Sequence, residues 1–322
     1  MSEWIRSKQH AVPSQAAAGV KKSPIASYLK TTWPFHMLLL PAVMVIFIYH
    51  YVPMLGIIIA FKEYKPWLGI FQSEWVGFDH FKYLFTYPDS KQVIWNTLII
   101  SSLKICSNLT VPFLFALLLN EVRAALFKRT VQTLVYLPHF LSWIILGGIL
   151  IDILSVKGGI VNQLVRLLGF EPVFFLGDGD WFRFTVIISD VWKDFGFSAI
   201  IYLAALSGIN PALYEAAEVD GANRWQMTLH ITVPSVLPIA VVVGTLALGK
   251  ILDGGFDQIF NLYNPLVYKK GDIIDTFVYR IGLVGGQFSF AAAVGLFKSV
   301  IGFLLVVISY RLAAKFANYR IF

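Results

Sequence analysis

Residues 207–221 read SGINPALYEAAEVDG, and they predict a short helix with a clear signal at each end. Asn210 is a favourable N-cap, and Pro211 suits the first helical position. Gly221 can adopt the left-handed conformation that ends a helix. A capped surface helix rich in Ala and Glu is common in proteins, so the segments around it must decide what it does.

Those segments are strongly apolar. Hydrophobic residues make up 57% of the 322 residues and charged residues 14%, whereas soluble chains carry about 25% charge. This composition excludes a water-soluble globule and a disordered chain. A bilayer-spanning helix needs about 20 apolar residues, and six segments are long enough: Phe35–Phe61, Val93–Leu119, Thr130–Leu154, Trp181–Leu206, Thr232–Leu252 and Ala291–Ala314.

The loops between these segments indicate an orientation. Residues 1–34 are polar and lack the features of a cleavable signal peptide, so we expect the first segment to anchor a retained amino terminus. With that terminus inside, the inner segments, 207–231 included, carry twelve cations and five acids, and the outer loops nine cations and eleven acids. The six apolar segments predict an all-α membrane protein with six transmembrane helices. The positive-inside rule predicts that both termini are cytoplasmic. This bias explains the net charge of +7 without a nucleic-acid partner.

The sequence carries no signature of catalysis, metal binding or nucleotide binding. The single cysteine, Cys106, excludes an internal disulfide and a Cys-based zinc site. Residues 244–250 read GTLALGK, close to a phosphate-binding loop, but Ile251 stands where Ser or Thr would reach magnesium. We therefore expect a protein that is not an enzyme, has no catalytic or metal-ligating residues and binds no cofactor.

The spacing around the predicted helix carries a resemblance. Glu215-Ala216-Ala217 is followed after three residues by Gly221, and further on by Ile231 and Val233-Pro234. This resembles the EAA motif of binding-protein-dependent ABC importer permeases, with Val233 in place of the usual Leu. The resemblance covers about 93–314, and it implies the type I importer permease fold.

The resemblance implies three domains and a coupling role. Residues 1–92 would form a cytoplasmic tail, the first span and a periplasmic loop; 93–314 the core, with the coupling loop at 207–234; and 315–322 a cytoplasmic tail. In this family the loop seats in a groove of a separate ATPase subunit. The residues that would do so here are Glu215, Ala216, Ala217, Asp220 and Gly221.

Two further segments, TLVYLPHFLSW (133–143) and GFDQIFNLYNPLVY (255–268), resemble the oligosaccharide and polysaccharide branch of the family, alginate importers in particular. The implied protein is half of the path of an ATP-driven importer in the bacterial inner membrane, with an acidic glycan such as alginate as cargo. Its implied partners are a second homologous permease, two ATPase subunits that bind ATP and Mg²⁺, a periplasmic solute-binding protein and membrane lipid.

Polar residues inside the apolar segments are the candidates for a translocation path. A lysine at the centre of a span costs about 2.5–3.5 kcal/mol, so such residues usually face the bundle interior or a wet cavity. Thr97, Ser101, Lys104 and Asn108 share one face of the second segment. The candidate path residues are Lys104, Asn108, Asp190, Lys193, Asp194, Lys250, Asp253, Asp257 and Lys298.

Simple pairing is the alternative explanation for these charges. Lys193 can pair with Asp190 or Asp194, and Lys250 with Asp253. Lys104 and Lys298 have no acid nearby in the sequence, so each needs a partner across the bundle or across a subunit interface. An excess of basic groups along the path would favour an acidic saccharide.

The loop at 253–290 mixes aromatic rings with polar residues. Single rings of this kind commonly belong to the aromatic belt at the membrane surface. A cluster of them would instead form a surface that docks a sugar or a partner. The candidates for periplasmic docking are Phe256, Phe260, Asn261, Tyr263 and Tyr268.

Two other classes of function compete with the importer permease. An ion-gradient-driven secondary sugar transporter would use Asp190 or Asp194 as a proton carrier, but the two halves of the chain show no self-similarity of the kind common in that class. A membrane receptor or assembly factor would need a cytoplasmic domain that the short loops do not provide.

Overall fold

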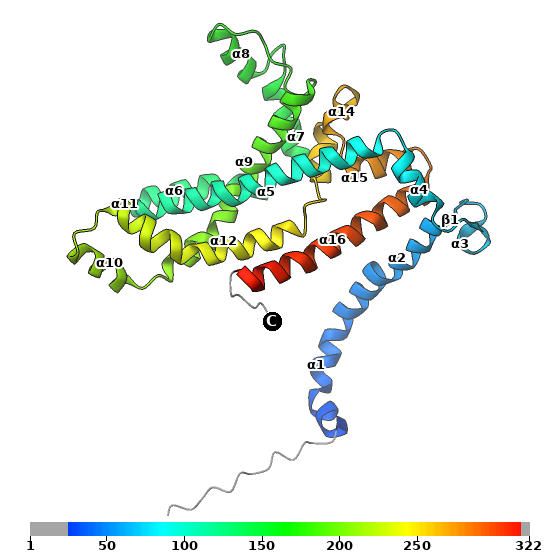
Figure 1. Cartoon of the computed structure of the whole chain (residues 1–322), viewed down its shortest axis with the longest axis horizontal. Helices are drawn as coiled ribbons and strands as arrows, with labels where there is room; N and C mark the ends of the chain where they lie inside the picture. Colours follow the sequence, from blue (N-terminus) through cyan, green and yellow to red (C-terminus); the bar gives the residue numbers. More distant parts are fainter. Residues whose placement is uncertain (1–24, 317–322) are drawn as a thin grey trace, which may run out of the picture. The chain divides into compact units, whose positions relative to one another are not determined.

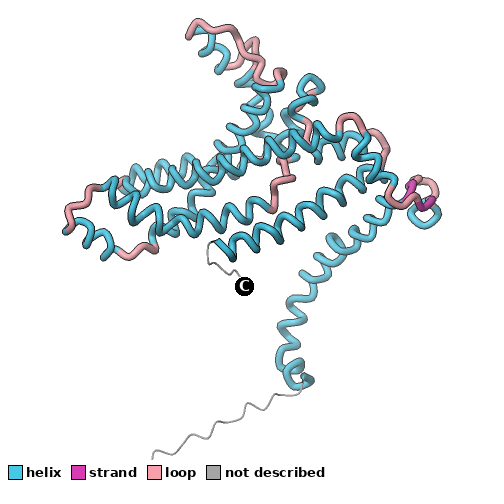
Figure 2. The backbone as a smooth tube through the Cα atoms, viewed as in Figure 1, coloured by secondary structure: helices cyan, strands magenta, loops and turns pink. Residues whose placement is uncertain are grey.

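The computed structural model describes the backbone of residues 25–316 and the side chains of residues 32–311. Residues 1–24 of the predicted amino-terminal tail and residues 317–322 of the predicted carboxy-terminal tail lie outside the described part. The chain divides into two compact units, one ending at Gly56 and one starting at Ile57. Figure 2 shows that helices and their connecting loops make up almost all of the described chain.

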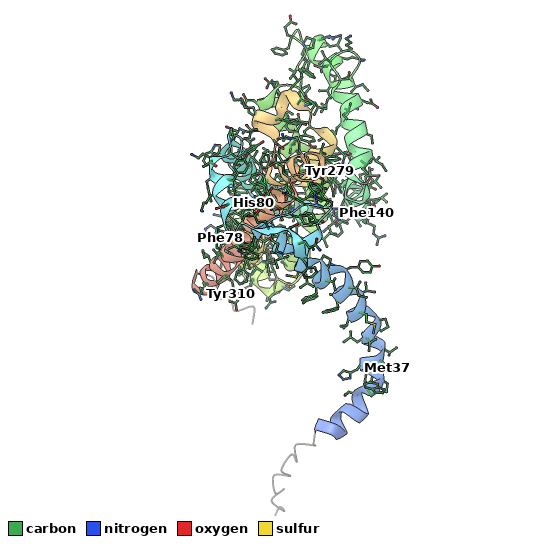
Figure 3. The ribbon with its side chains drawn as sticks, turned by 90° about the vertical axis from the view of Figure 1, so that its right-hand side faces the viewer. Met37, Phe78, His80, Phe140, Tyr279 and Tyr310 are labelled. Atoms are coloured by element: carbon green, nitrogen blue, oxygen red, sulfur yellow. The ribbon has the colours of Figure 1, made fainter. Side chains whose placement is uncertain are left out.

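The first unit is a single apolar rod. It consists of α1 (Ile25–Ile46), a π-helical turn (Phe47–Tyr51) and α2 (Val52–Met54), and a 3-10 turn (Leu55–Phe61) continues into the second unit. Its side chains project on all sides, as around Met37 in Figure 3, and most of its large apolar residues are exposed. Thr32–Phe61 is long and apolar enough to cross a membrane, which agrees with the predicted first span.

The second unit contains the remaining elements (Figure 1). The helices of its main bundle are α5 (Ser90–Glu121), α6 (Ala125–Tyr136), α7 (Trp143–Leu154), α9 (Gly179–Ser207), α12 (Val233–Leu248) and α16 (Phe288–Phe316). The shorter helices are α3 (Gly69–Gln72), α4 (Asp79–Thr86), α8 (Ile160–Leu167), α10 (Pro211–Val219), α11 (Arg224–Met227), α13 (Phe256–Leu262), α14 (Tyr268–Gly271) and α15 (Ile274–Val278). Two strands, β1 (Lys62–Glu63) and β2 (Glu74–Trp75), form an antiparallel pair that the all-α prediction did not include. Within this unit, α10 and the strand pair lie at opposite ends.

Four described helical segments are long and apolar enough to span a membrane, and six if each of two bent helix pairs counts as one span. The predicted third span, Thr130–Leu154, is one of these pairs, and it is not a continuous helix. Its two halves, Ala125–Phe140 and Trp143–Leu154, meet at 103°. With 12 residues, α7 is about 18 Å long, which is shorter than the roughly 30 Å hydrocarbon core.

The break follows from local sequence. Pro138 lies in the 3-10 turn Leu137–Phe140, and a proline cannot donate the backbone hydrogen bond that an α-helix requires. Ser142 then starts α7 as its N-cap, because its hydroxyl accepts a hydrogen bond from the N–H of Ile145 at 3.4 Å. Both signals lie inside an apolar segment, so hydropathy alone does not reveal the bend.

The main bundle is held together by close packing. Helix α5 packs along α9, and a buried cluster at the α10 end joins Ala116, Ala199, Tyr202, Leu206 and Val236. Since lipid is as apolar as these side chains, their packing rather than a hydrophobic driving force stabilises the contact. Gly196 permits a close approach of α9 to α6, because a Cβ at this position would lie 2.3 Å from the carbonyl oxygen of Val135.

Candidate functional site

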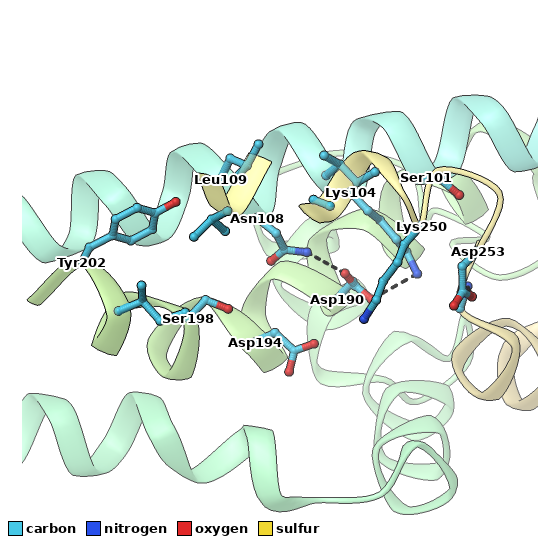
Figure 4. Close-up of a pocket in the computed structure, with 15 residues that line it drawn as sticks. Ser101, Lys104, Asn108, Leu109, Asp190, Asp194, Ser198, Tyr202, Lys250 and Asp253 are labelled. Carbon is cyan, nitrogen blue, oxygen red and sulfur yellow. Dashed lines mark hydrogen bonds and ion pairs between the residues drawn. The ribbon is translucent and has the colours of Figure 1, made fainter. Parts of the chain in front are cut away.

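A cavity of about 400 Å³ lies between α5, α9 and α12, and Asp253 and Gly255 from the loop after α12 also line it. Figure 4 shows its lining, in which side chains from α5 and α9 face each other and Lys250 reaches in after the end of α12. Six of the nine predicted path residues line it: Lys104, Asn108, Asp190, Asp194, Lys250 and Asp253. A volume of this size is typical of a small-molecule site.

Three polar atoms in this lining are buried and have no hydrogen-bond partner among the described protein atoms. They are the hydroxyl oxygens of Ser101 and Tyr202 and the amide oxygen of Asn108. Buried polar atoms in proteins are nearly always satisfied by protein, water or ligand. The side chains around the cavity therefore include three polar atoms that the described protein leaves unpaired, and none of the three is open to solvent.

Lys104 is fixed by partners from three segments. Its ammonium lies 3.1 Å from a carboxylate oxygen of Asp190 and donates to the carbonyl oxygen of Gly254 at 2.9 Å and to the side-chain oxygen of Gln258. The lysine side chain is 8% exposed and the aspartate side chain 16%. Asp190 also accepts a hydrogen bond from Asn108 at 2.8 Å. The acid that Lys104 lacks in the sequence nearby is thus supplied across the bundle, from the same chain.

The break in the third span is tied to α9 beside this cavity. A ring nitrogen of His139 lies 2.8 Å from a carboxylate oxygen of Asp194, and the ring stacks on Phe197 at a centroid distance of 4.0 Å. Lys193 donates to the carbonyl oxygen of His139 at 2.6 Å, which satisfies a backbone acceptor at the end of a helical segment. Its ammonium is 4.0 Å from Asp194, so this predicted pair is only a peripheral contact.

The structure agrees with some of the remaining predictions about charged residues and contradicts others. Lys298 finds a partner across the bundle, since its ammonium contacts both carboxylate oxygens of Asp275 at 2.6 and 2.8 Å. Within residues 32–311, Lys250 makes no ion pair, so the expected pairing with Asp253 is wrong. Asp257 is exposed and lies outside the cavity. The lining carries two lysines and three aspartates, so it has no excess of basic groups of the kind that would favour an acidic saccharide.

Several lining residues were not among the predicted ones. Ser198 and Tyr202 follow Asp190 and Asp194 on α9 in steps of four residues, which places all four on one helix face. That spacing could have identified them. Gln258 carries no comparable signal, because its role depends on where α13 meets α9, where its amide donates to the carbonyl oxygen of Val186 at 2.7 Å.

The aromatic residues predicted for docking form a connected cluster. Phe256 stacks on Phe260 at 5.1 Å, and Phe260 meets Tyr279, labelled in Figure 3, at 4.9 Å. Tyr263 lies 5.1 Å from Tyr268. The rings are thus gathered on α13, α14 and the turn after α15 rather than scattered along the membrane surface.

Hydrogen bonds anchor the loop that carries these rings. Asn96 in α5 donates to the carbonyl oxygen of Asp272 at 3.1 Å, and Arg183 in α9 donates to that of Lys270 at 2.7 Å. The carboxylate of Asp272 is buried against Arg280; burial raises the pKa of Asp272, and its hydrogen bonds oppose that rise. Burial, reinforced by the neighbouring Tyr268, raises the pKa of Tyr263 to about 12.

Asn261 belongs to a second cavity, of about 680 Å³, next to the ring cluster. This cavity lies between the end of α7 and the residues after α13, and it also contains Tyr263, Phe174 and Lys157. The amide of Asn261 donates to the carbonyl oxygen of Asp257 at 2.7 Å. The predicted docking residues therefore adjoin a hollow between α7 and the residues after α13.

The loop at residues 207–221 has the predicted conformation. Helix α10 starts at Pro211, and Asn210 caps it by accepting a hydrogen bond from the N–H of Ala212 at 3.1 Å. Gly221 has φ +76°. The predicted coupling residues Glu215, Ala216, Asp220 and Gly221 are exposed, and Ala217 is half-buried.

One side-chain contact connects this loop to the next helix. The hydroxyl groups of Tyr214 in α10 and Thr232 lie 2.9 Å apart. Thr232 is buried and ends the π-helical turn Thr228–Thr232, directly before α12. Since α12 reaches the cavity with Val243, Ala247 and the following Lys250, this bond joins the surface loop to a cavity wall.

Comparison with known proteins agrees with these features. Residues 108–318 match the family model described as binding-protein-dependent transport system inner membrane component. The chain is 45% identical over 287 residues to the polygalacturonan/rhamnogalacturonan transport system permease protein YteP of Bacillus subtilis (strain 168), with 89% of each chain covered. It is 40% identical over 320 residues to protein LplB of the same organism, with 99% of this chain and all of the relative covered.

Solved structures show the same fold. A chain of a bacterial ABC transporter involved in import of the acidic polysaccharide alginate superposes with a TM-score of 0.84 at 40% identity, over 91% of this chain and 99% of that chain. A chain of a bacterial alginate ABC transporter in complex with an alginate pentasaccharide-bound periplasmic protein gives a TM-score of 0.85 at 38% identity, over 93% and 100%.

Proposed function

The chain belongs to the family of inner membrane components of binding-protein-dependent transport systems, and on this premise we propose that it forms half of the translocation path of an importer for acidic oligo- or polysaccharides. As a member of this family it is an ABC permease with the type I importer fold. It is a transport subunit and not an enzyme, and separate ATPase subunits hydrolyse ATP.

The cavity between α5, α9 and α12 is the observation that carries the proposed role in transport. It lies between helices of the membrane-spanning core, and its lining includes the polar side chains of Asn108, Ser198 and Lys250. Saccharides are recognised by such groups because their hydroxyls both donate and accept hydrogen bonds. The relatives named for alginate and for polygalacturonan handle uronate polymers, which supports an acidic substrate.

The partners follow from the incompleteness of one chain. One copy supplies one wall and one coupling helix, so a second homologous permease completes the path. Two ATPase subunits bind ATP and Mg²⁺ and seat α10 through Glu215, Ala216, Ala217, Asp220 and Gly221. A soluble binding protein delivers cargo to the face formed by Phe256, Phe260, Asn261, Tyr263 and Tyr268. Closure of the ATPases moves the coupling helices together and tips the cavity outward.

The proposed orientation places α10 on the cytoplasmic side of a bacterial inner membrane and the ring cluster on the periplasmic side. The distribution of Lys and Arg supports it. The secondary-transporter alternative loses its basis, since family membership assigns the chain to binding-protein-dependent systems. Its candidate proton carrier, Asp190, is in addition engaged by Lys104 and Asn108.

Reconstitution of the complete complex tests this function. The two permeases, the ATPases and the binding protein are placed in proteoliposomes, and ATP-dependent uptake is measured for trigalacturonate, an alginate trisaccharide and maltotriose. Uptake of either acidic trisaccharide above that of maltotriose is expected. Uptake of maltotriose alone contradicts the acidic substrate, and a complex that takes up none of the three contradicts the assignment to saccharides.

A further inference from the structure

The two lysines of the cavity lining are in different situations. Lys104 is buried, and its ammonium already contacts Asp190, Gly254 and Gln258. Lys250 is exposed to the cavity and makes no side-chain hydrogen bond or ion pair with any residue of 32–311. In Figure 4 its side chain extends across the cavity toward α9, and its ammonium points into the space between the helices.

None of the three carboxylates in the cavity lining pairs with Lys250. Each of them already accepts a hydrogen bond from another group: Asp190 from Asn108 at 2.8 Å, Asp194 from His139 at 2.8 Å, and Asp253 from the backbone N–H of Gly255 at 3.2 Å. Lys250 is therefore available for an anion that enters the cavity, while Lys104 is not.

An available ammonium at this place calls for an explanation. Lysines in or near membrane spans are rare, and they pair with other groups or mark a substrate path. Helix α12 is largely apolar and ends at Leu248, and Lys250 follows two positions later in the cavity lining. Capping does not account for it, since the last carbonyls of α12 accept backbone hydrogen bonds from the N–H groups of Lys250 and Ile251.

We propose that Lys250 determines the specificity of this cavity for acidic saccharides by binding a carboxylate of the substrate, whereas Lys104 only holds the wall together. This inference rests on the proposed function. A uronate residue carries one carboxylate among several hydroxyls. The lining matches that pattern, with one available ammonium and the partly exposed polar side chains of Asn108 and Ser198.

A binding titration in detergent on the complex of both permeases and the ATPases, without the binding protein, tests the proposal. The probes are trigalacturonate and its methyl ester, which has the same hydroxyls but no charge. The unmodified complex is expected to bind the acid more tightly than the ester. Lys250→Gln should weaken binding of the acid about tenfold, as expected for a hydrogen bond to a charged group, and leave binding of the ester unchanged. Lys250→Arg should keep the preference for the acid.

Lys91→Gln provides the matched control. Lys91 is an exposed lysine near the start of α5 and does not line the cavity, so this substitution removes the same charge without touching the proposed contact. Binding of both probes should stay as in the unmodified complex.

Three results would overturn the proposal: no preference for the acid in the unmodified complex, equal weakening of both probes by Lys250→Gln, or loss of the second permease from the Lys250→Gln complex. The last would mean that Lys250 holds a subunit interface. The proteoliposome assay distinguishes a failure of the proposed function from a failure of the proposed role of Lys250. If the unmodified complex imports saccharides while Lys250→Gln keeps its preference for the acid, the proposed function stands and only the role of Lys250 fails.

Discussion

Replacing Lys104 by Met should destabilise the protein, and adding Asp190→Asn should restore most of the loss. The single substitution leaves the carboxylate of Asp190, 16% exposed, without the ammonium that lies 3.1 Å from it. It also removes the donor to Gly254 and Gln258. The neutral amide at position 190 no longer needs a counter-charge, and its oxygen can still accept the hydrogen bond from Asn108.

The expected magnitude comes from the burial of the pair. Breaking a buried ion pair by removing one partner costs about 3–5 kcal/mol. At about 2 °C per kcal/mol for a chain of this size, the melting temperature should fall by about 6–10 °C. The double variant should recover the part due to the stranded charge and retain a deficit of about 1–3 kcal/mol from the acceptors that lose their donor.

Thermal unfolding of the purified complex in detergent, followed by tryptophan fluorescence, measures these shifts. Lys91→Met removes an exposed charge from the same helix and should melt like the unmodified protein. The reasoning is refuted if Lys104→Met also melts at that temperature, or if the double variant melts no higher than the single one. Either result would mean that Lys104 and Asp190 do not form a stabilising pair.

Three further predictions concern the coupling loop and the bundle. Glu215→Lys and Gly221→Val should each leave the permease inserted but detach it from the ATPases. The first reverses an exposed charge, and the second strains a turn in which Gly221 has φ +76°. Pull-down of the ATPases checks both. Gly196→Val should lower the yield of folded protein because no space exists beside α6, and size-exclusion chromatography measures that loss. Tyr214→Phe should lower uptake per ATP hydrolysed while the ATPases stay bound. Adding Thr232→Val to Tyr214→Phe should lower uptake per ATP no further.

Local signals in the sequence were sufficient for the coupling loop and for the polar face of α5. Capping residues and the left-handed glycine act within a few residues of each other, so the boundaries of α10 could be predicted from 207–221 alone. Likewise, Thr97, Ser101 and Lys104 are buried together as their helical spacing predicts. The family resemblance and the permease role also held, because they rest on the same short-range spacing.

Pairings between helices were beyond the reach of such signals. Lys104 and Asp190 are 86 positions apart, and their contact depends on how α5 packs against α9. Sequence spacing favours neighbours such as Lys250 and Asp253, although the carboxylate of Asp253 instead accepts a hydrogen bond from the N–H of Gly255. The bend after His139 was missed because hydropathy averages over a proline and a capping serine inside an apolar run. The roles of the path, docking and coupling residues remain predictions.

The geometry between the coupling loop and the cavity explains why Tyr214 is a sharper test of coupling than the exposed residues of the loop. Helix α9 ends three residues before α10 begins, and its buried face carries Asp190 and Asp194 to the cavity. Helix α12 starts directly after Thr232 and ends just before Lys250. A displacement of α10 is therefore expected to reach one wall through the chain and the other through the 2.9 Å bond between Tyr214 and Thr232. Glu215 and Gly221 are proposed to hold the ATPase, so their replacement would abolish hydrolysis-driven transport without showing how the motion reaches the cavity. Tyr214→Phe removes only one partly buried hydroxyl and leaves the exposed residues of the coupling loop unchanged. Any change in uptake per ATP then reports on the connection to α12 alone.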